Sequence, residues 1–133
     1  MPKEQEEDIR AANLYTDDIK YDPDHYCLLP DIEEDMIAFN EEQFKSLMNE
    51  IGPMRASGKL LDLSKDIECP VAAIHGKNDP HPWEGVKEPL ENRLNDFKMY
   101  LLDKCGHDPW KEYYAKDEFF AILKNELKST GTV

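Results

Sequence analysis

Two residues, Asp79 and His107, could do acid–base chemistry together. Asp79 follows an apolar run at residues 70–76, and His107 follows a second apolar run at residues 97–102, 28 positions after Asp79. A carboxylate that accepts a hydrogen bond from one imidazole nitrogen fixes the tautomer of the ring and leaves the other nitrogen to take a proton from a nucleophile. The two residue types therefore predict an orienting acid and a general base, provided that the fold brings them together.

The elements around the pair predict that it does. Both apolar runs lack alternation and are bounded by turn residues, which is typical of parallel strands buried on both faces. Residues 83–94 form a helix candidate, although Pro89 interrupts the pattern and the helix could begin near there instead. Residues 111–127 predict a last helix. Its inward residues are expected to be Phe119, Phe120, Leu123 and Leu127.

The order strand, helix, strand, helix is typical of the α/β class with a right-handed crossover between parallel neighbours. In such sheets, functional residues gather in the loops beyond the carboxyl ends of the strands. Asp79 and His107 occupy those loops, and Gly106 is expected to allow a tight turn that projects the histidine ring.

The N-terminal part predicts mainly helical structure. A short helix is expected at residues 4–14, an irregular connection at 15–30, and a helix capped by Asp31. Asn40, with Gln43 at the capping-box position, predicts the start of the next helix. The apolar stripe of that helix comprises Phe44, Leu47, Met48 and Ile51. Gly52-Pro53 should end or kink it. Residues 54–65 predict a further helical turn or two that buries Leu60, Leu61 and Leu63.

The sequences around the pair resemble a known family. HGKND, which ends at Asp79, and LLDKCGH, which ends at His107, resemble the acid loop and the histidine loop of α/β-hydrolases, where the triad order is Ser, then Asp or Glu, then His. The flanking Cys69-Pro70, Asp79-Pro80-His81-Pro82 and His107-Asp108-Pro109-Trp110 extend the similarity to a bacterial-type subgroup over residues 58–127. The resemblance implies a partial α/β-hydrolase fold. Residues 1–57 would be an acidic, mainly helical lid-like segment, and residues 58–133 the C-terminal half.

The nucleophile of that family has no counterpart here. The chain contains no G-x-S-x-G and no HGGG-like run, and the earlier strands of the family fold are absent. Its serines are Ser46, Ser57, Ser64 and Ser129. Lys77 stands where the family often has an acid. The resemblance implies ester or acyl hydrolysis of a small molecule in a complete enzyme, whereas this chain alone should be inactive.

The same loops hold other candidate nucleophiles and metal ligands. Cys69 and Cys105 are alternative nucleophiles, but each is expected to be a small buried hydrophobe. A metal could draw on His75, Asp79, His81 and His107. Because His75 ends a buried strand and no HxxxH pair occurs, we expect no metal and no cofactor. Trp83 and Trp110 follow the two loops, and they could line a substrate pocket or pack against the end of the sheet.

Two parallel strands do not make a stable sheet alone, and an uncovered edge invites pairing with another chain. Three readings follow. The chain could be a hydrolase fragment completed by an N-terminal half, a homo-oligomer that merges two half-sheets, or a non-enzymatic interaction module with residual triad residues.

Composition excludes several classes of partner. The net charge is −13, and residues 1–40 hold twelve acids against three bases, so we expect neither nucleic acid nor an anionic membrane as a partner. Three cysteines without a CxxC pair favour a reducing compartment. No apolar run reaches the roughly 18–20 residues that cross a bilayer, and the N-terminus lacks the apolar core of a signal peptide. The sequence therefore predicts a cytoplasmic protein.

Overall fold

The structure is a computed structural model that describes residues 18–27 and 38–131. In chain order its elements are α2 (Glu41–Ala56), α3 (Lys59–Asp62), the 3-10 turn η2 (Leu63–Asp66), β1 (Val71–Gly76), α4 (Glu84–Glu91), β2 (Phe97–Leu102) and α5 (Lys116–Ser129). The helices expected at residues 4–14 and after Asp31 lie outside the described residues. Mixed helices and a parallel pair of strands confirm the α/β class.

The two strands are the centre of this small fold. β1 and β2 pair in parallel, with register from Val71↔Phe97 to Gly76↔Leu102. The helix between them, α4, makes the crossover that parallel neighbours need. Both strands lie within one residue of the positions predicted from their apolar runs.

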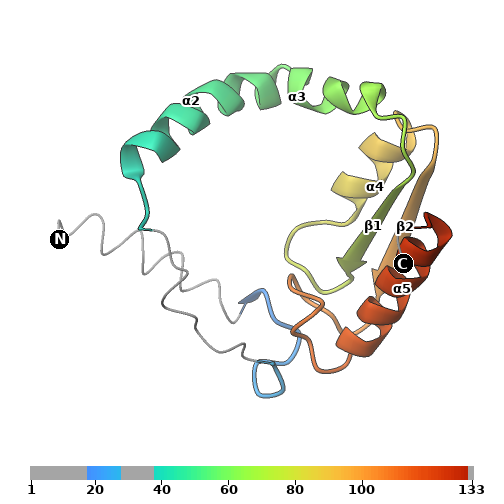
Figure 1. Cartoon of the computed structure of the whole chain (residues 1–133). Helices are drawn as coiled ribbons and strands as arrows, with labels where there is room; N and C mark the ends of the chain where they lie inside the picture. The colour runs from blue at the N-terminus through green and yellow to red at the C-terminus, as the bar shows by residue number, and fades with distance from the viewer. Residues whose placement is uncertain (1–17, 28–37, 132–133) are drawn as a thin grey trace.

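Helices cover both faces of the strand pair. Figure 1 shows α4 on one side of the strands and α5 on the other. The core lies under α5 and at the carboxyl ends of the strands. It comprises Leu102, Cys105 and Ala115, with Ile74, Phe119 and Ile122 packed against them. The core is therefore concentrated at the end of the sheet that carries the two candidate loops.

The prediction that the strands are buried on both faces is wrong for most of their length. Only Gly76 of β1 and Leu102 of β2 are buried, and Ala72 is exposed. The physical reason is thin cover: the helices on the two faces, α4 and α5, contain no buried residue. The sheet also has two strands within the described residues, so one edge of β1 is unpaired there. The amide of Val71 donates to Asp96, on the β2 side. By alternation along the ladder, Ala72 and Ile74 direct their amides to the free edge.

The structure fixes the helix boundaries that the prolines left open. Pro53 lies inside α2 and does not end it. Pro89 lies inside α4, which begins at Glu84, within one residue of the predicted start at residue 83. No residue of either helix is buried, so water can satisfy the carbonyl that loses its partner at each proline. The last helix begins at Lys116 rather than at residue 111, because residues 108–115 form turns closed by their own backbone hydrogen bonds.

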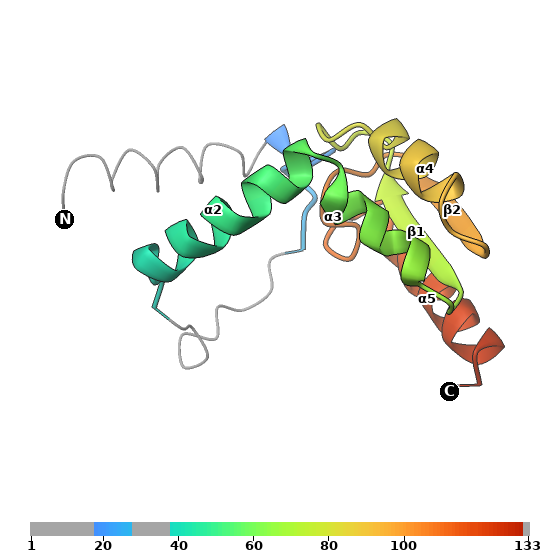
Figure 2. The same cartoon turned by 90° about the horizontal axis from the view of Figure 1, so that it is seen from above.

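The predicted burial of several apolar residues is also wrong. Asn40 caps α2 as expected, since its side chain accepts from the amide of Gln43. However, both views place α2 away from the strands (Figures 1 and 2), and no residue of α2 is buried. Of the residues that were expected to be buried, the exposed ones are Leu60, Leu63, Phe120 and Leu123. The apolar stripe of α2 is also exposed at Phe44, Leu47 and Met48. No helix within the described ranges has the length and apolar character needed to cross a bilayer.

Candidate active site

The loops after β1 and β2 pack against each other backbone to backbone. The amide of Asn78 donates to the Cys105 carbonyl at 2.8 Å, and Lys77 pairs with Asp103 at 2.6 Å. A Cβ atom on Gly76 would overlap with the carbonyls of Cys105 and Gly106. The absence of a side chain at Gly76 therefore lets the acid loop and the histidine loop meet.

Gly106 is required for a different reason from the one expected. Its φ is not positive; the left-handed residue in this loop is Lys104, with φ 50°. A Cβ on Gly106 would overlap with the carbonyl of Ile19 and meet a carboxylate oxygen of Glu112. The absence of a side chain at Gly106 thus lets the segment that contains Ile19 pass close to the loop, and it is not needed for a tight turn.

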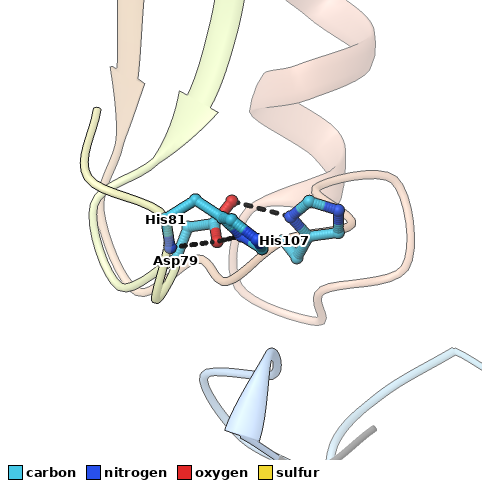
Figure 3. A group of neighbouring side chains, drawn as sticks. All are labelled: Asp79, His81 and His107. Carbon is cyan, nitrogen blue, oxygen red and sulfur yellow. Dashed lines mark hydrogen bonds and ion pairs between the residues drawn. The ribbon is translucent and has the colours of Figure 1, made fainter. Parts of the chain in front are cut away.

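The structure brings Asp79 and His107 together, as their spacing predicts. Nδ1 of His107 lies 2.8 Å from Oδ2 of Asp79 (Figure 3). The carboxylate side chain is 5% exposed, whereas the imidazole is 47% exposed. The acid is therefore held inside the loops while the ring presents a face to solvent. The catalytic role of the two residues stays a prediction.

Hydrogen bonds keep Asp79 ionised. Burial is the strongest single influence and opposes ionisation, but donors from the His81 amide and from the rings of His107 and His81 together hold the pKa of this carboxyl below its usual value. An ionised carboxylate only accepts hydrogen bonds, so Nδ1 of His107 carries the proton. In the neutral ring the lone pair is then on Nε2, the nitrogen that a general base needs.

Two further histidines face the same carboxylate. The His81 amide and ring Nδ1 lie 2.9 and 2.8 Å from Oδ1 of Asp79. Nε2 of His75 lies 3.7 Å from Oδ2, while its Nδ1 bonds the carbonyl of Gly76. The side chain of His81 is 69% exposed. The number of imidazoles around Asp79 exceeds what a simple acid–base pair needs.

A small cavity adjoins the pair. It has a volume of about 500 Å³ and is lined by Ile19, Pro80, His81 and His107. Trp83 and Trp110 are not among these lining residues. The ring of Trp110 contacts Phe119 at 5.9 Å between centroids, which supports the packing reading of that residue.

The cysteines have surroundings unlike those of a nucleophile. Cys105 is fully buried, and burial, followed by the negative charges of Glu112 and Asp79, raises the pKa of its thiol to about 12. A thiol with such a pKa is protonated at neutral pH. Cys69 is exposed, contrary to expectation, and precedes β1 at the opposite end of the strand from Asp79.

Three of the four serines are bonded within their own helical turns. The hydroxyls of Ser57, Ser64 and Ser129 donate to the carbonyls of Met54, Leu61 and Glu126. Ser46 lies in α2, which both views place away from the sheet (Figures 1 and 2). These positions agree with the absence of a nucleophile elbow from the sequence.

Sequence reasoning missed Glu112, which holds the histidine loop. Its side chain is fully buried, and Oε1 accepts from the amides of Gly106 at 2.9 Å and Tyr21 at 3.1 Å. The amide of His107 also donates to the Ile19 carbonyl at 2.7 Å. Residues 18–27 therefore form a strap across the histidine loop. Glu112 lies between Trp110 and Tyr113 and follows no helical or strand periodicity. Its partner Tyr21 is 91 positions away in the sequence.

A second contact region anchors the same strap. Tyr26 bridges to Glu112 as an isolated antiparallel pair, and its hydroxyl donates to Asp108 at 2.9 Å. The amide of Cys27 donates to the carbonyl of Lys111 at 2.8 Å. The strap thus contacts residues on both sides of His107.

Comparison of the chain with protein-family models, with curated proteins and with solved structures finds no match. The geometry of these loops therefore carries the functional content. The observation with the most chemical content is the buried carboxylate of Asp79 beneath an exposed imidazole.

Glu112→Ala should loosen the histidine loop. The substitution leaves the buried amide of Gly106 and the part-buried amide of Tyr21 without an acceptor. A buried amide that loses its acceptor costs about 1–3 kcal/mol, and a part-buried one costs less. We expect the free energy of unfolding in urea to fall by about 3 kcal/mol, and the Gly106 and His107 amides to lose protection in hydrogen exchange. Glu112→Gln keeps one acceptor oxygen and should lose less. The exposed Glu68→Ala serves as the control, with a change within about 0.5 kcal/mol.

Asp79→Asn should change the tautomer of His107. An asparagine amide that faces Nδ1 donates to it, so the ring proton moves to Nε2 and the base lone pair is lost. Long-range ¹H–¹⁵N NMR should show Nδ1 of His107 turn from a protonated to an unprotonated nitrogen. Asp22→Asn removes a matched pair, because Asp22 bonds Nδ1 of the exposed His25 at 2.9 Å. That control should leave the His107 signals unchanged; an unaltered His107 in Asp79→Asn would refute the orienting role.

Proposed function

We propose that the chain is the acid–histidine part of an α/β-hydrolase-type site, completed by a nucleophile on another chain. The observation that carries the proposal is the 2.8 Å contact between buried Asp79 Oδ2 and Nδ1 of the half-exposed His107. The loop sequences that resemble the family support it. The reaction class is hydrolysis of an ester or acyl bond in a small molecule.

In this proposal His107 is the general base. Nε2 takes the proton of a hydroxyl nucleophile as that hydroxyl attacks the acyl carbon, and later gives the proton to the leaving group. Asp79 holds the ring in the required tautomer and stabilises the imidazolium that forms. Because the carboxylate is buried and hydrogen-bonded by a backbone amide, little reorganisation is needed when the charge develops.

The partner is proposed to continue the sheet at the free edge of β1. A groove of about 570 Å³ lies between the strand pair and α5, with Asp96 and Lys98 of the β2 side in its lining, and it reaches β1. Its apolar lining includes Val71, Ala72, Ile74, Leu123 and Leu127. A neighbouring strand would cover these residues and pair with the outward amides of β1. Such a strand supplies both the missing cover and an element that can position a nucleophile.

The alternative is a non-enzymatic, self-associating module. It is favoured by the exposed apolar residues of α2, among them Phe44, Leu47 and Met48, since exposed apolar patches commonly mark protein contacts. In this reading Asp79 and His107 are residual, and two copies merge their half-sheets.

A fluorophosphonate serine probe separates the two functions. The isolated chain should remain unlabelled, because it carries no activated hydroxyl. When the chain is recovered with its natural partner, we expect the partner to be labelled and His107→Ala to slow labelling by about 10³-fold or more, since the base is lost. His25→Ala is the matched control and should label at the normal rate. Labelling of the isolated chain would contradict the proposal, and a partner labelled equally with His107→Ala would favour the interaction module.

Ala72→Pro should block pairing at the free edge of β1 without unfolding the chain. The Ala72 amide points away from β2, so proline removes no hydrogen bond of the existing pair. In the self-associating alternative, sedimentation velocity of the chain alone shows an assembled species for the natural chain and a smaller one for Ala72→Pro. Ala72→Thr keeps the amide and should assemble normally. A natural chain that sediments as a folded monomer at all concentrations would exclude self-association, and equal assembly of both variants would place the contact elsewhere.

A further inference from the structure

The ring of His81 takes no proton in the hydrolase proposal, yet it contacts Asp79 as closely as the ring of His107 does. Asp79 Oδ1 lies 2.8 Å from Nδ1 of His81, and Oδ2 lies 2.8 Å from Nδ1 of His107. The two rings lie 5.0 Å apart between centroids, and one ligand atom from each of the three residues lies within 4.8 Å of the others (Figure 3). The geometry points to a binding site for a divalent transition metal, Zn²⁺ in the first place, formed by Asp79, His81 and His107.

The donor set selects the class of metal. Two imidazoles and a carboxylate suit Zn²⁺, which is commonly held by three protein ligands with a fourth position open to water. Imidazole nitrogen also suits Cu²⁺ and Ni²⁺, whereas Mg²⁺ and Ca²⁺ prefer oxygen donors alone. The cluster should therefore discriminate strongly against the last two ions.

The positions fit a tetrahedral ion after a small movement. Metal–ligand distances near 2.0–2.1 Å place ligand atoms about 3.3 Å apart, so atoms that now lie within 4.8 Å must close by at most about 1.5 Å. The side chains of His81 and His107 are 69% and 47% exposed, and that of Asp79 is 5% exposed. The rings are free to turn toward an ion, while the carboxylate is fixed.

The backbone arranges the three residues in advance. The amide of His81 donates to Oδ1 of Asp79 at 2.9 Å, which fixes the histidine relative to the acid two positions before it. The Asn78 amide donates to the Cys105 carbonyl at 2.8 Å and joins this loop to the one that carries His107. Arrangement of ligands before binding lowers the ordering cost that an ion must overcome.

Metal binding and general-base catalysis exclude each other here, because both use His107. An ion that draws His107 away from Asp79 removes the arrangement on which the hydrolase proposal depends. The inference goes beyond that proposal and does not rest on it, since binding is measured on this chain alone. A chain that binds Zn²⁺ without ever supporting hydrolysis would separate the two.

The experiment titrates the untagged chain, stripped by a chelator, with Zn²⁺ by calorimetry and with Co²⁺ by visible absorption. We expect one Zn²⁺ per chain, no measurable Mg²⁺ or Ca²⁺ binding, and the intense bands of four-coordinate Co²⁺. His81→Ala should weaken Zn²⁺ binding by at least about 100-fold. Loss of a residue that only hydrogen-bonds to a metal ligand lowers metal affinity about 10–100-fold, and loss of a ligand itself should lower it at least as much. His25→Ala is the matched control, since His25 pairs with Asp22 but has no second imidazole in that contact. It should bind normally.

NMR keeps the test independent of any effect of substitution on folding. In the natural chain, Zn²⁺ should shift the imidazole nitrogens of His81 and His107 together and leave those of His25 in place. Absence of Zn²⁺ binding, equal affinity of His81→Ala, or near-ultraviolet thiolate bands that assign the Co²⁺ to cysteine would each overturn the inference.

Discussion

The candidate site depends on one buried carboxylate, that of Glu112. Its Oε1 holds the amides of Gly106 and Tyr21, and so joins the histidine loop to the strap at residues 18–27. His107 follows Gly106 directly, and its own amide bonds the strap at Ile19. A loop without these contacts would sample many backbone conformations, and each ordered residue costs about 1–2 kcal/mol in entropy. The contacts of Glu112 thus offset the cost of fixing the catalytic candidate.

Two carboxylates, those of Glu112 and Asp79, position His107 in different ways. Glu112 fixes the backbone that carries the ring, whereas Asp79 fixes the orientation and tautomer of the ring itself. Gly76 and Gly106 make both contacts geometrically feasible, because a side chain at either position would overlap with neighbouring carbonyls. The arrangement is complete within the two strands, their loops and the strap. It can therefore exist before any further strand joins the sheet.

The features that depend on neighbouring residues in the sequence were predicted correctly. The apolar runs gave β1 and β2, Asn40 gave the start of α2, and the spacing of the loops gave the meeting of Asp79 with His107. The predictions of burial failed where they assumed a cover. Phe120 and Leu123 have the periodicity of inward residues but are exposed. Periodicity shows which side chains share one face of a helix. Whether that face is covered depends on segments far away in the sequence or on another protein chain. Glu112 was missed for the same reason, because its role depends on a segment 91 positions away.

Within the described residues, one edge of β1 is unpaired and the imidazole of His107 is half-exposed. A two-stranded parallel sheet has too little apolar contact to be stable alone, so cover at β1 would stabilise the fold. A parallel strand added there would lie about 4.8 Å from β1 and would end at the same edge of the sheet as Asp79. In the proposed assembly, the loop after that strand would stand at the same edge of the sheet as the half-exposed imidazole and would present a hydroxyl there. In that proposal, a strand at the free edge of β1 would both cover the fold and bring the loop that holds the hydroxyl to the sheet edge of Asp79 and His107.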